Sequence, residues 1–362
     1  MHPYELPSLH AVRVAAQLIS DVVLKTPTKA SLQLTSLANQ KLQRNGISEP
    51  IPQVELLLKC ENFQRTGSFK FRGAYHFIAK LTNDELKNGV VAYSTGNHAQ
   101  AVAHAAQLAS QNRNISVPAY VVVPSDCPHK KISAAEAHGA TVIFSGPNPN
   151  DRVILAEQVQ SATGAVLIPP ADDQNIVLGQ ATAVQEFVQQ ANQMGRNLDA
   201  IIVPSGGGGL LCGAIAVCKP RGIAVFGAEP ESGGPSLAHA LQTGRRTLEI
   251  EHPGSIADGL RSLTGEANWE HIKFEGNVQD VLTVSEAQIK EALRIGVQGL
   301  GFAIEPSAAV PLAAVLFGHP FRDWVESLNK RIEVGVILTG GNVSMKDLVA
   351  LVPELNVTKG RI

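Results

Sequence analysis

The sequence has few cysteines and no long run of positive charge. Its cysteines (Cys60, Cys127, Cys212 and Cys218) show no C-x-x-C spacing and lie mostly among apolar residues. They are predicted to be reduced thiols in or near the core, which argues against a disulfide framework or a zinc site. No run of lysine and arginine exceeds two residues, and the net charge is −2. This charge pattern favours neither nucleic acid nor an anionic membrane as a partner.

Long apolar runs are also missing. No such run reaches about 18 residues, the length of a membrane-spanning helix. The N-terminal MHPYELPSLHAV lacks the basic and apolar regions of a signal peptide, so we expect a cytoplasmic protein. A chain of 362 residues with 44% hydrophobic and 17% charged residues is long enough for two domains with ample core.

Strand-like and helix-like segments alternate along the chain. Short apolar runs typical of strands occupy residues 54–59, 90–93, 119–123, 141–144, 198–204, 222–230 and 333–343. Helical spacing of apolar residues covers 8–24, 73–81, 131–138, 151–161, 179–194 and 285–295, whereas 233–263 shows no regular pattern. The alternation predicts parallel sheets with helices on their faces. Because no linker separates the halves, we expect two lobes that share a cleft.

The segment ENFQRTGSFKFRGA, residues 61–74, places Lys70 between Phe69 and Phe71. A lysine without a special role keeps its ammonium group in water. Here the flanking rings would exclude water, and desolvation lowers the pKa of an amine because it disfavours the charged form. Attack on a carbonyl requires the neutral amine, so Lys70 is a candidate for covalent catalysis.

Four consecutive glycines, Gly206 to Gly209, lie between an apolar strand and an apolar helix. A glycine run can be a flexible linker. The anchored ends favour instead a turn whose backbone N–H groups converge on an anion at a helix N-terminus. No Walker lysine follows, and no acidic residue has the spacing of a dinucleotide site. The run therefore favours the phosphate of a small cofactor.

Two further polar turns follow predicted strands. The first consists of Ser94, Thr95, Gly96, Asn97 and His98. Its hydroxyl, amide and N–H groups suit a carboxylate, but taken alone the pattern favours plain N-capping of the next helix by Ser94, Thr95 or Asn97. The second turn consists of Thr339, Gly340, Gly341 and Asn342. It ends the final strand, where ligands of parallel sheets bind.

Together these segments resemble the fold-type II pyridoxal-phosphate enzymes, specifically the threonine/serine dehydratase and serine racemase family. TGSFKFRGA, STGNHAQA, SGGGGLLCG and LTGGN occur in the family's order, together with TPTKAS at 26–31 and DD…GQ at 172–180. Pyridoxal 5′-phosphate needs a lysine, a phosphate site, a partner for its ring nitrogen and a carboxylate site nearby. The resemblance implies a tryptophan synthase β-like α/β fold. It would have two lobes, each with a mainly parallel open sheet flanked by helices.

The resemblance also implies a role for each motif residue. Lys70 would form the Schiff base, and Phe69 would pack on one face of the cofactor ring. Asn97 would hydrogen-bond the ring's 3′ oxygen, and Thr339 would face the ring nitrogen, where the family usually has serine. The phosphate would be held by Gly206, Gly207, Gly208, Gly209 and Leu210. The substrate carboxylate would be bound by Ser94, Thr95, Gly96, Asn97 and His98.

Two positions depart from the family's pattern. Thr95 stands where racemases carry serine and dehydratases commonly carry alanine. Its hydroxyl leaves two-base chemistry open, but its methyl group restricts the rotamer and weighs against efficient racemisation. At the family's divalent-cation site Glu229 is present, but Pro235 replaces the downstream acidic ligand. Proline has no side-chain oxygen, so we expect no bound metal.

The expected activity is that of a pyridoxal-phosphate-dependent ammonia-lyase, a lyase of the dehydratase type. Lys70 would remove the Cα proton, and loss of the β-hydroxyl would lead to a 2-oxo acid and ammonia. L-threonine or L-serine is the default substrate. A bulkier or acidic relative, such as phenylserine or 3-hydroxyaspartate, stays open because Ala171 and Tyr93 suggest an unusual side-chain pocket.

Three alternatives remain open at this point. They are an amino-acid racemase on the same scaffold, a β-replacement synthase, and a non-catalytic protein that binds pyridoxal phosphate or an amino acid. We expect residues 1–88 and 171–362 to form a large cofactor-binding domain and residues 89–170 a small domain that closes over substrate. The resemblance implies a homodimer.

Overall fold

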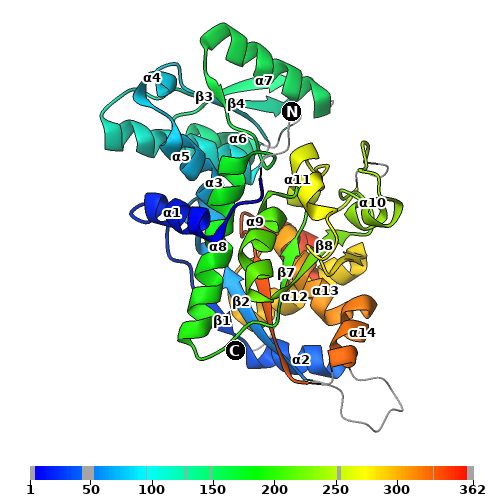
Figure 1. The fold of residues 1–362 in the computed structure, drawn as a ribbon. Helices are drawn as coiled ribbons and strands as arrows, with labels where there is room; N and C mark the ends of the chain where they lie inside the picture. Colours follow the sequence, from blue (N-terminus) through cyan, green and yellow to red (C-terminus); the bar gives the residue numbers. More distant parts are fainter. Residues whose placement is uncertain are drawn as a thin grey trace.

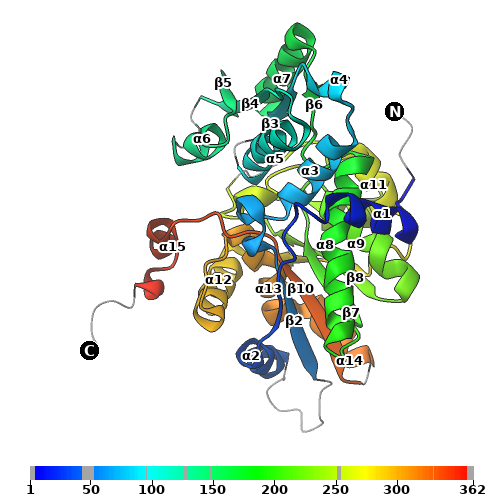
Figure 2. The same cartoon turned by 90° about the vertical axis from the view of Figure 1, so that its left-hand side faces the viewer.

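The structure is a computed structural model that describes residues 5–42, 53–94, 96–125, 127, 129–146, 149–250, 254–328 and 330–356. Figures 1 and 2 show two α/β units, one above the other. Helices α3 (Lys70–Lys80), α5 (Asn97–Arg113) and α8 (Gln174–Gln193) pack side by side where the units meet. The α/β fold with two mainly parallel sheets confirms the prediction from the sequence.

The larger sheet has six strands in the order β1-β2-β10-β7-β8-β9. Its strands are β1 (Thr28–Ala30), β2 (Val54–Cys60), β7 (Ala200–Pro204), β8 (Ala224–Pro230), β9 (Asp280–Val284) and β10 (Ile332–Leu338). All neighbours are parallel except β1 and β2. Because β10 lies between β2 and β7, the carboxyl ends of strands far apart in sequence meet at one edge, where open α/β sheets bind ligands.

The smaller sheet has four parallel strands in the order β5-β4-β3-β6. They are β3 (Val90–Tyr93), β4 (Ala119–Pro124), β5 (Thr141–Ser145) and β6 (Val166–Leu167). All four strands fall inside residues 89–170, the range expected to form the small domain. The division into domains 1–88 with 171–362 and 89–170 stays a prediction, as does the closing movement.

Helices cover both faces of the larger sheet, and the strand residues alternate between them. Along β10, Val336 and Leu338 pack into one apolar cluster and Ile337 into the other. The first cluster is covered by α2 (Leu32–Leu42), α12 (Glu286–Leu300), α13 (Pro306–Phe317) and α14 (His319–Leu328). The second is covered by α1 (Leu9–Ile19), α8, α9 (Gly209–Cys218), α10 (Leu237–Thr243) and α11 (Glu266–Ile272).

The smaller sheet is covered in the same way. Helices α3 and α5 share one apolar cluster with it, and α7 (Pro149–Thr163) packs against the other face. The remaining helices are α4 (Asn83–Leu86), α6 (His129–Glu136) and α15 (Met345–Leu351). Short 3₁₀ turns lie at η1 (Glu61–Phe63), η2 (Arg65–Gly67), η3 (Lys219–Arg221), η4 (Asp258–Leu260) and η5 (Pro353–Leu355).

Several expected bounds were wrong: α8 begins at Gln174 and not at residue 179, and β10 ends at Leu338 and not at residue 343. The segment 233–263 is not wholly irregular, because it contains α10 and η4. Helix α3 begins at Lys70 and not at residue 73, which places the lysine in its first turn. All four cysteines are buried thiols outside any disulfide, as predicted. Within the described residues, no helix combines the length and apolarity needed to cross a membrane.

Candidate active site

Lys70 is held beside the end of β10. It is the first residue of α3, which begins shortly after β2. The N–H of Phe69 donates to the carbonyl of Thr339 at 3.1 Å. Ser68 also pairs with Gly340 in an isolated antiparallel bridge. These contacts join the lysine segment to Thr339, whose side chain is buried at the carboxyl end of the strand.

The amine of Lys70 is sheltered from water. Its Nζ donates to the carbonyl of Pro170 at 2.6 Å and lies 5.3 Å from the centre of the Phe69 ring. Burial lowers the pKa of Lys70 to about 8, because a desolvated amine resists protonation. Phe71 does not contribute in the way the sequence suggested, since its ring is buried and stacks on Tyr75.

A buried group of charges anchors α3 below the lysine. The Arg72 guanidinium donates to both oxygens of Glu61 at 2.8 Å and also reaches Glu186 of α8 at 3.1 Å. Lys59 of β2 pairs with Glu186 at 2.5 Å. Opposite charges therefore balance, and each buried ion has a partner, as burial of charge requires. The cluster fixes the start of α3 against β2 and α8.

The glycine turn, Gly206–Gly209, connects β7 to α9. Gly208 is the N-cap of α9, with φ of 90°, and no side chain caps this helix end. The N–H groups of Gly209 and Leu210 therefore belong to an uncapped N-terminus, which favours an anion. A Cβ on Gly209 would lie 2.8 Å from the carbonyl oxygen of Ala171, so the packing requires glycine here.

One short segment touches both the amine and the glycine turn. Pro170 accepts from Lys70, and the next residue, Ala171, packs against the turn. A Cβ on Gly207 would come within 2.6 Å of the Ala171 Cβ. Asn268 of α11 donates to the carbonyls of both Ala171 and Gly207, at 3.2 and 2.8 Å. Lys70 and the predicted phosphate site therefore belong to one site.

The polar turn after β3 lies at the start of α5. Ser94 Oγ accepts from the N–H of Gly96 at 3.3 Å, so this hydroxyl closes the turn. Gly96 is the N-cap of α5, and no side chain caps this end. Plain N-capping therefore does not explain the polar residues, and the helix end can take a carboxylate. Thr95 lies outside the described residues.

His98 is unsuited to proton transfer. Its ring is buried, and Nε2 lies 2.9 Å from the carbonyl of Ile168. Burial lowers the pKa of His98 to about 3, and the positive charge of Lys70 contributes to the shift. The imidazole is therefore neutral at physiological pH and donates from Nε2. It ties the start of α5 to the segment after β6.

The side chain of Asn97 forms hydrogen bonds with Glu305 and Asn342. The sequence did not predict these contacts. Its Nδ2 donates to Glu305 Oε1 at 2.8 Å, and its Oδ1 accepts from Asn342 Nδ2 at 2.7 Å. Glu305 is the N-cap residue of α13 and is almost fully buried. A glutamate before a proline indicates a helix start in sequence, but nothing local predicts contact with a residue 208 positions away.

Glu229 is engaged as a helix cap. Its two oxygens accept from the N–H groups of Leu237 and Ala238, each at 2.8 Å, at the start of α10. Burial raises the pKa of Glu229, and these hydrogen bonds oppose the shift. Among the described residues there is no group of three or more His, Cys, Asp or Glu that could hold a metal ion.

Comparison with known proteins shows the family to which the chain belongs. Residues 37–325 match the family model described as pyridoxal-phosphate dependent enzyme. The chain belongs to this family. Within it, the chain is 34% identical over 350 residues to the L-threo-3-hydroxyaspartate ammonia-lyase of Saccharomyces cerevisiae, covering 96% of this chain and 97% of the relative.

Solved structures of pyridoxal-phosphate-dependent enzymes share the fold. The serine racemase of Dictyostelium discoideum superposes with a TM-score of 0.80 at 34% identity and covers 94% of this chain and 100% of its own. The threonine deaminase of T.th. gives a TM-score of 0.79 at 35% identity, with 93% and 99% covered. The predicted relationship to fold-type II dehydratases and racemases is therefore confirmed.

The residues present fit pyridoxal phosphate, the cofactor of this family. Lys70 supplies a sheltered amine with a lowered pKa. The glycine turn supplies an uncapped helix end in a cradle that a Cβ would fill at Gly207 or Gly209. Thr339 lies next to the lysine segment, where the ring nitrogen partner is expected. The individual contacts of Phe69, Asn97, Thr339 and the turn with the cofactor stay predictions.

Proposed function

We propose that this pyridoxal-phosphate-dependent enzyme is an ammonia-lyase that acts on a β-hydroxy amino acid. The observation that carries the proposal is the Lys70 amine, which is desolvated, has a pKa of about 8, and shares the segment 170–171 with the glycine turn. The uncapped start of α5 offers a place for the substrate carboxylate. Relatives named as ammonia-lyases and deaminases support this activity.

When bound, pyridoxal phosphate supplies an electron sink joined to the substrate nitrogen. The Lys70 amine would remove the Cα proton, because its lowered pKa makes the neutral form available. Thr339 offers the ring nitrogen a hydroxyl and not a carboxylate, which favours prompt loss of the β-hydroxyl. The proton and the hydroxyl leave as water. The released enamine takes up water and gives a 2-oxo acid and ammonia.

Racemisation is the alternative, because serine racemases are equally similar relatives. It would need a second proton donor on the face of Cα opposite Lys70, and the sequence alone makes Thr95 the candidate for that role. His98 does not supply it, since its pKa of about 3 leaves it unprotonated. The methyl group of Thr95 restricts its rotamers, and for this reason we favour β-elimination.

A substrate assay tests the proposed activity. The holoenzyme is incubated with L-serine, L-threonine and L-threo-3-hydroxyaspartate, and 2-oxo acid, ammonia and D-amino acid are measured. We expect equal amounts of 2-oxo acid and ammonia, exceeding any D-amino acid. More D-serine than pyruvate from L-serine would make the protein a racemase, and no product from any substrate would favour a binding protein.

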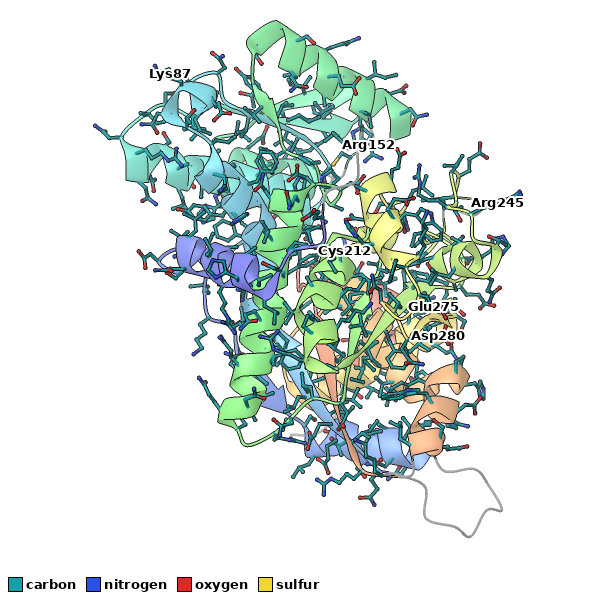
Figure 3. The ribbon with its side chains drawn as sticks, viewed as in Figure 1. Lys87, Arg152, Cys212, Arg245, Glu275 and Asp280 are labelled. Atoms are coloured by element: carbon teal, nitrogen blue, oxygen red, sulfur yellow. The ribbon has the colours of Figure 1, made fainter. Side chains whose placement is uncertain are left out.

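One observation favours an acidic substrate within this class. Arg152, in the first turn of α7, has a buried Nε without a hydrogen-bond partner among the described residues. Burial, followed by the negative charges of Asp172 and Glu157, raises the pKa of Tyr93 at the end of β3. The positive charge of Arg152 opposes that shift, so its guanidinium lies near Tyr93. Figure 3 labels Arg152 on the side of the smaller unit that faces the larger one.

We therefore expect Arg152 to select for a second carboxylate on the substrate. Arg152→Leu should lower kcat/KM for L-threo-3-hydroxyaspartate by about 100-fold, because a desolvated carboxylate would lose its charged donor. The value for L-serine should change by less than about threefold. Arg245→Leu, at an exposed arginine, is the control. An equal loss with both substrates would show that Arg152 has no part in selectivity.

The remaining expectations concern the oligomeric state, the cellular location and the binding partners of the protein. A homodimer and a cytoplasmic location remain our proposals, as does the absence of nucleic-acid and membrane partners. An amino-acid substrate follows from the family to which the chain belongs.

A further inference from the structure

Hydrogen bonds of Asn97 and its partner Asn342 link four chain segments. Asn97 begins α5, which packs on the smaller sheet, whereas its partners belong to the larger unit. Glu305 is the N-cap of α13, and Asn342 follows β10. Asn342 Nδ2 also donates to the carbonyl of Thr66, just before the Lys70 segment, at 2.7 Å. The Asn97 amide thus connects the smaller unit directly with two segments near the lysine and, through Asn342, with a third.

The hydrogen bonds leave only one orientation for each amide. The Thr66 carbonyl can only accept, so the Asn342 atom that faces it is nitrogen. This nitrogen also faces Asn97, whose nearer atom must then be oxygen. The other end of the Asn97 amide is therefore the nitrogen, and it donates to the carboxylate of Glu305. One N–H of the Asn97 side-chain amide donates to Glu305. Because the amide is planar, the direction of its second N–H is then fixed.

Glu305 is well placed to impose this orientation. It is buried, and its backbone N–H donates to the carbonyl of Gly340 at 3.0 Å. A Cβ on Gly340 would lie 2.5 Å from Glu305 Oε1, so the carboxylate packs against the residue that follows Thr339. The glutamate is thus anchored to the end of β10 and reaches Asn97 across the boundary between the units.

We propose that Glu305 is a positioning residue that orients the Asn97 amide toward the 3′ oxygen of pyridoxal phosphate. This inference rests on the proposed role of Asn97 in cofactor binding. Glu305 accepts one N–H of Nδ2, so that the second N–H is directed to the cofactor and the start of α5 is held against the larger unit. Because Glu305 acts through Asn97, its removal has no further effect once Asn97 is gone.

A double-mutant cycle on cofactor affinity tests the proposal. The dissociation constant of pyridoxal phosphate is measured for Glu305→Ala, Asn97→Ala and the double variant. We expect each single variant to bind about tenfold more weakly, as loss of one hydrogen bond to a charged or polar partner predicts, and the double variant to match Asn97→Ala. Glu305→Gln keeps an oxygen acceptor and should stay within about threefold of the wild type. Glu136→Ala, at an exposed glutamate of α6, is the control.

A second readout uses the protein without cofactor. Backbone hydrogen exchange in the first turn of α5 should become faster in Glu305→Ala but not in Glu305→Gln, because only alanine removes the acceptor. Unchanged exchange in Glu305→Ala would overturn the proposal. So would additive effects of Glu305→Ala and Asn97→Ala on the dissociation constant, or an unchanged constant in either single variant.

The outcome is separable from that of the proposed activity. If the wild type releases ammonia and Glu305→Ala leaves the dissociation constant unchanged, the positioning role is wrong and the ammonia-lyase assignment stands. If the predicted cycle is found but the wild type releases no ammonia, the positioning role stands and the ammonia-lyase assignment is wrong.

Discussion

Lys70→Ala should abolish ammonia release, with a loss of at least about a thousandfold in kcat. The variant lacks both the amine that binds the cofactor covalently and the base that removes the Cα proton. Its absorption band near the edge of the visible, which the cofactor gains on joining a lysine, should also be missing. Steady-state kinetics and an absorption spectrum of the purified variant check both expectations.

Lys80→Ala is the matched control, because Lys80 lies at the exposed end of the same helix, α3. It should keep the wild-type rate and spectrum. Residual turnover of Lys70→Ala above about a tenth of the wild-type rate would mean that another group removes the Cα proton. Of the other lysines, Lys59 is fully buried but paired with Glu186, and this bond makes it unsuited to the role.

Gly209→Ala should weaken binding of pyridoxal phosphate by about 100-fold, because overpacking costs about 3 kcal/mol. The new Cβ would lie 2.8 Å from the carbonyl oxygen of Ala171. Backbone cannot give way as the end of a side chain can, so α9 must shift and its uncapped N–H groups move with it. Fluorescence titration of cofactor-free protein measures the dissociation constant.

Gly254→Ala is the control, since a Cβ there meets no atom within 4 Å. It should bind the cofactor as the wild type does. If Gly209→Ala bound pyridoxal phosphate normally while its thermal stability was unchanged, the turn would not be the phosphate site. A loss of affinity in both variants would point to a general effect of removing glycine.

The sequence allowed much of the fold to be predicted because its strands are short apolar runs with clear boundaries. The run at 90–93 coincides with β3, and β2 extends only one residue beyond the predicted 54–59. Lys70 and the glycine turn could also be predicted, because an amine between aromatic rings and a run of four glycines each indicate a particular kind of chemistry. Helix α10 was missed because its start is capped by Glu229, which lies eight positions before Leu237.

Contacts between distant segments could not be predicted in the same way. The Glu305–Asn97 bond joins residues 208 positions apart, and Arg72 meets Glu186 across 114. No periodicity or local propensity encodes such pairs, because they form only when segments far apart in the chain pack together. Local sequence also misled at Phe71, which flanks Lys70 in the chain but turns into the core, since consecutive residues of a helix point in different directions.

The most direct test of the account is reduction of the holoenzyme with borohydride, followed by peptide mass spectrometry. This treatment makes the link between a lysine and pyridoxal phosphate permanent. We predict that the cofactor is found on Lys70 and that Lys59 is unmodified. A protein that takes up no pyridoxal phosphate, or that carries it on a lysine other than Lys70, would contradict the assignment.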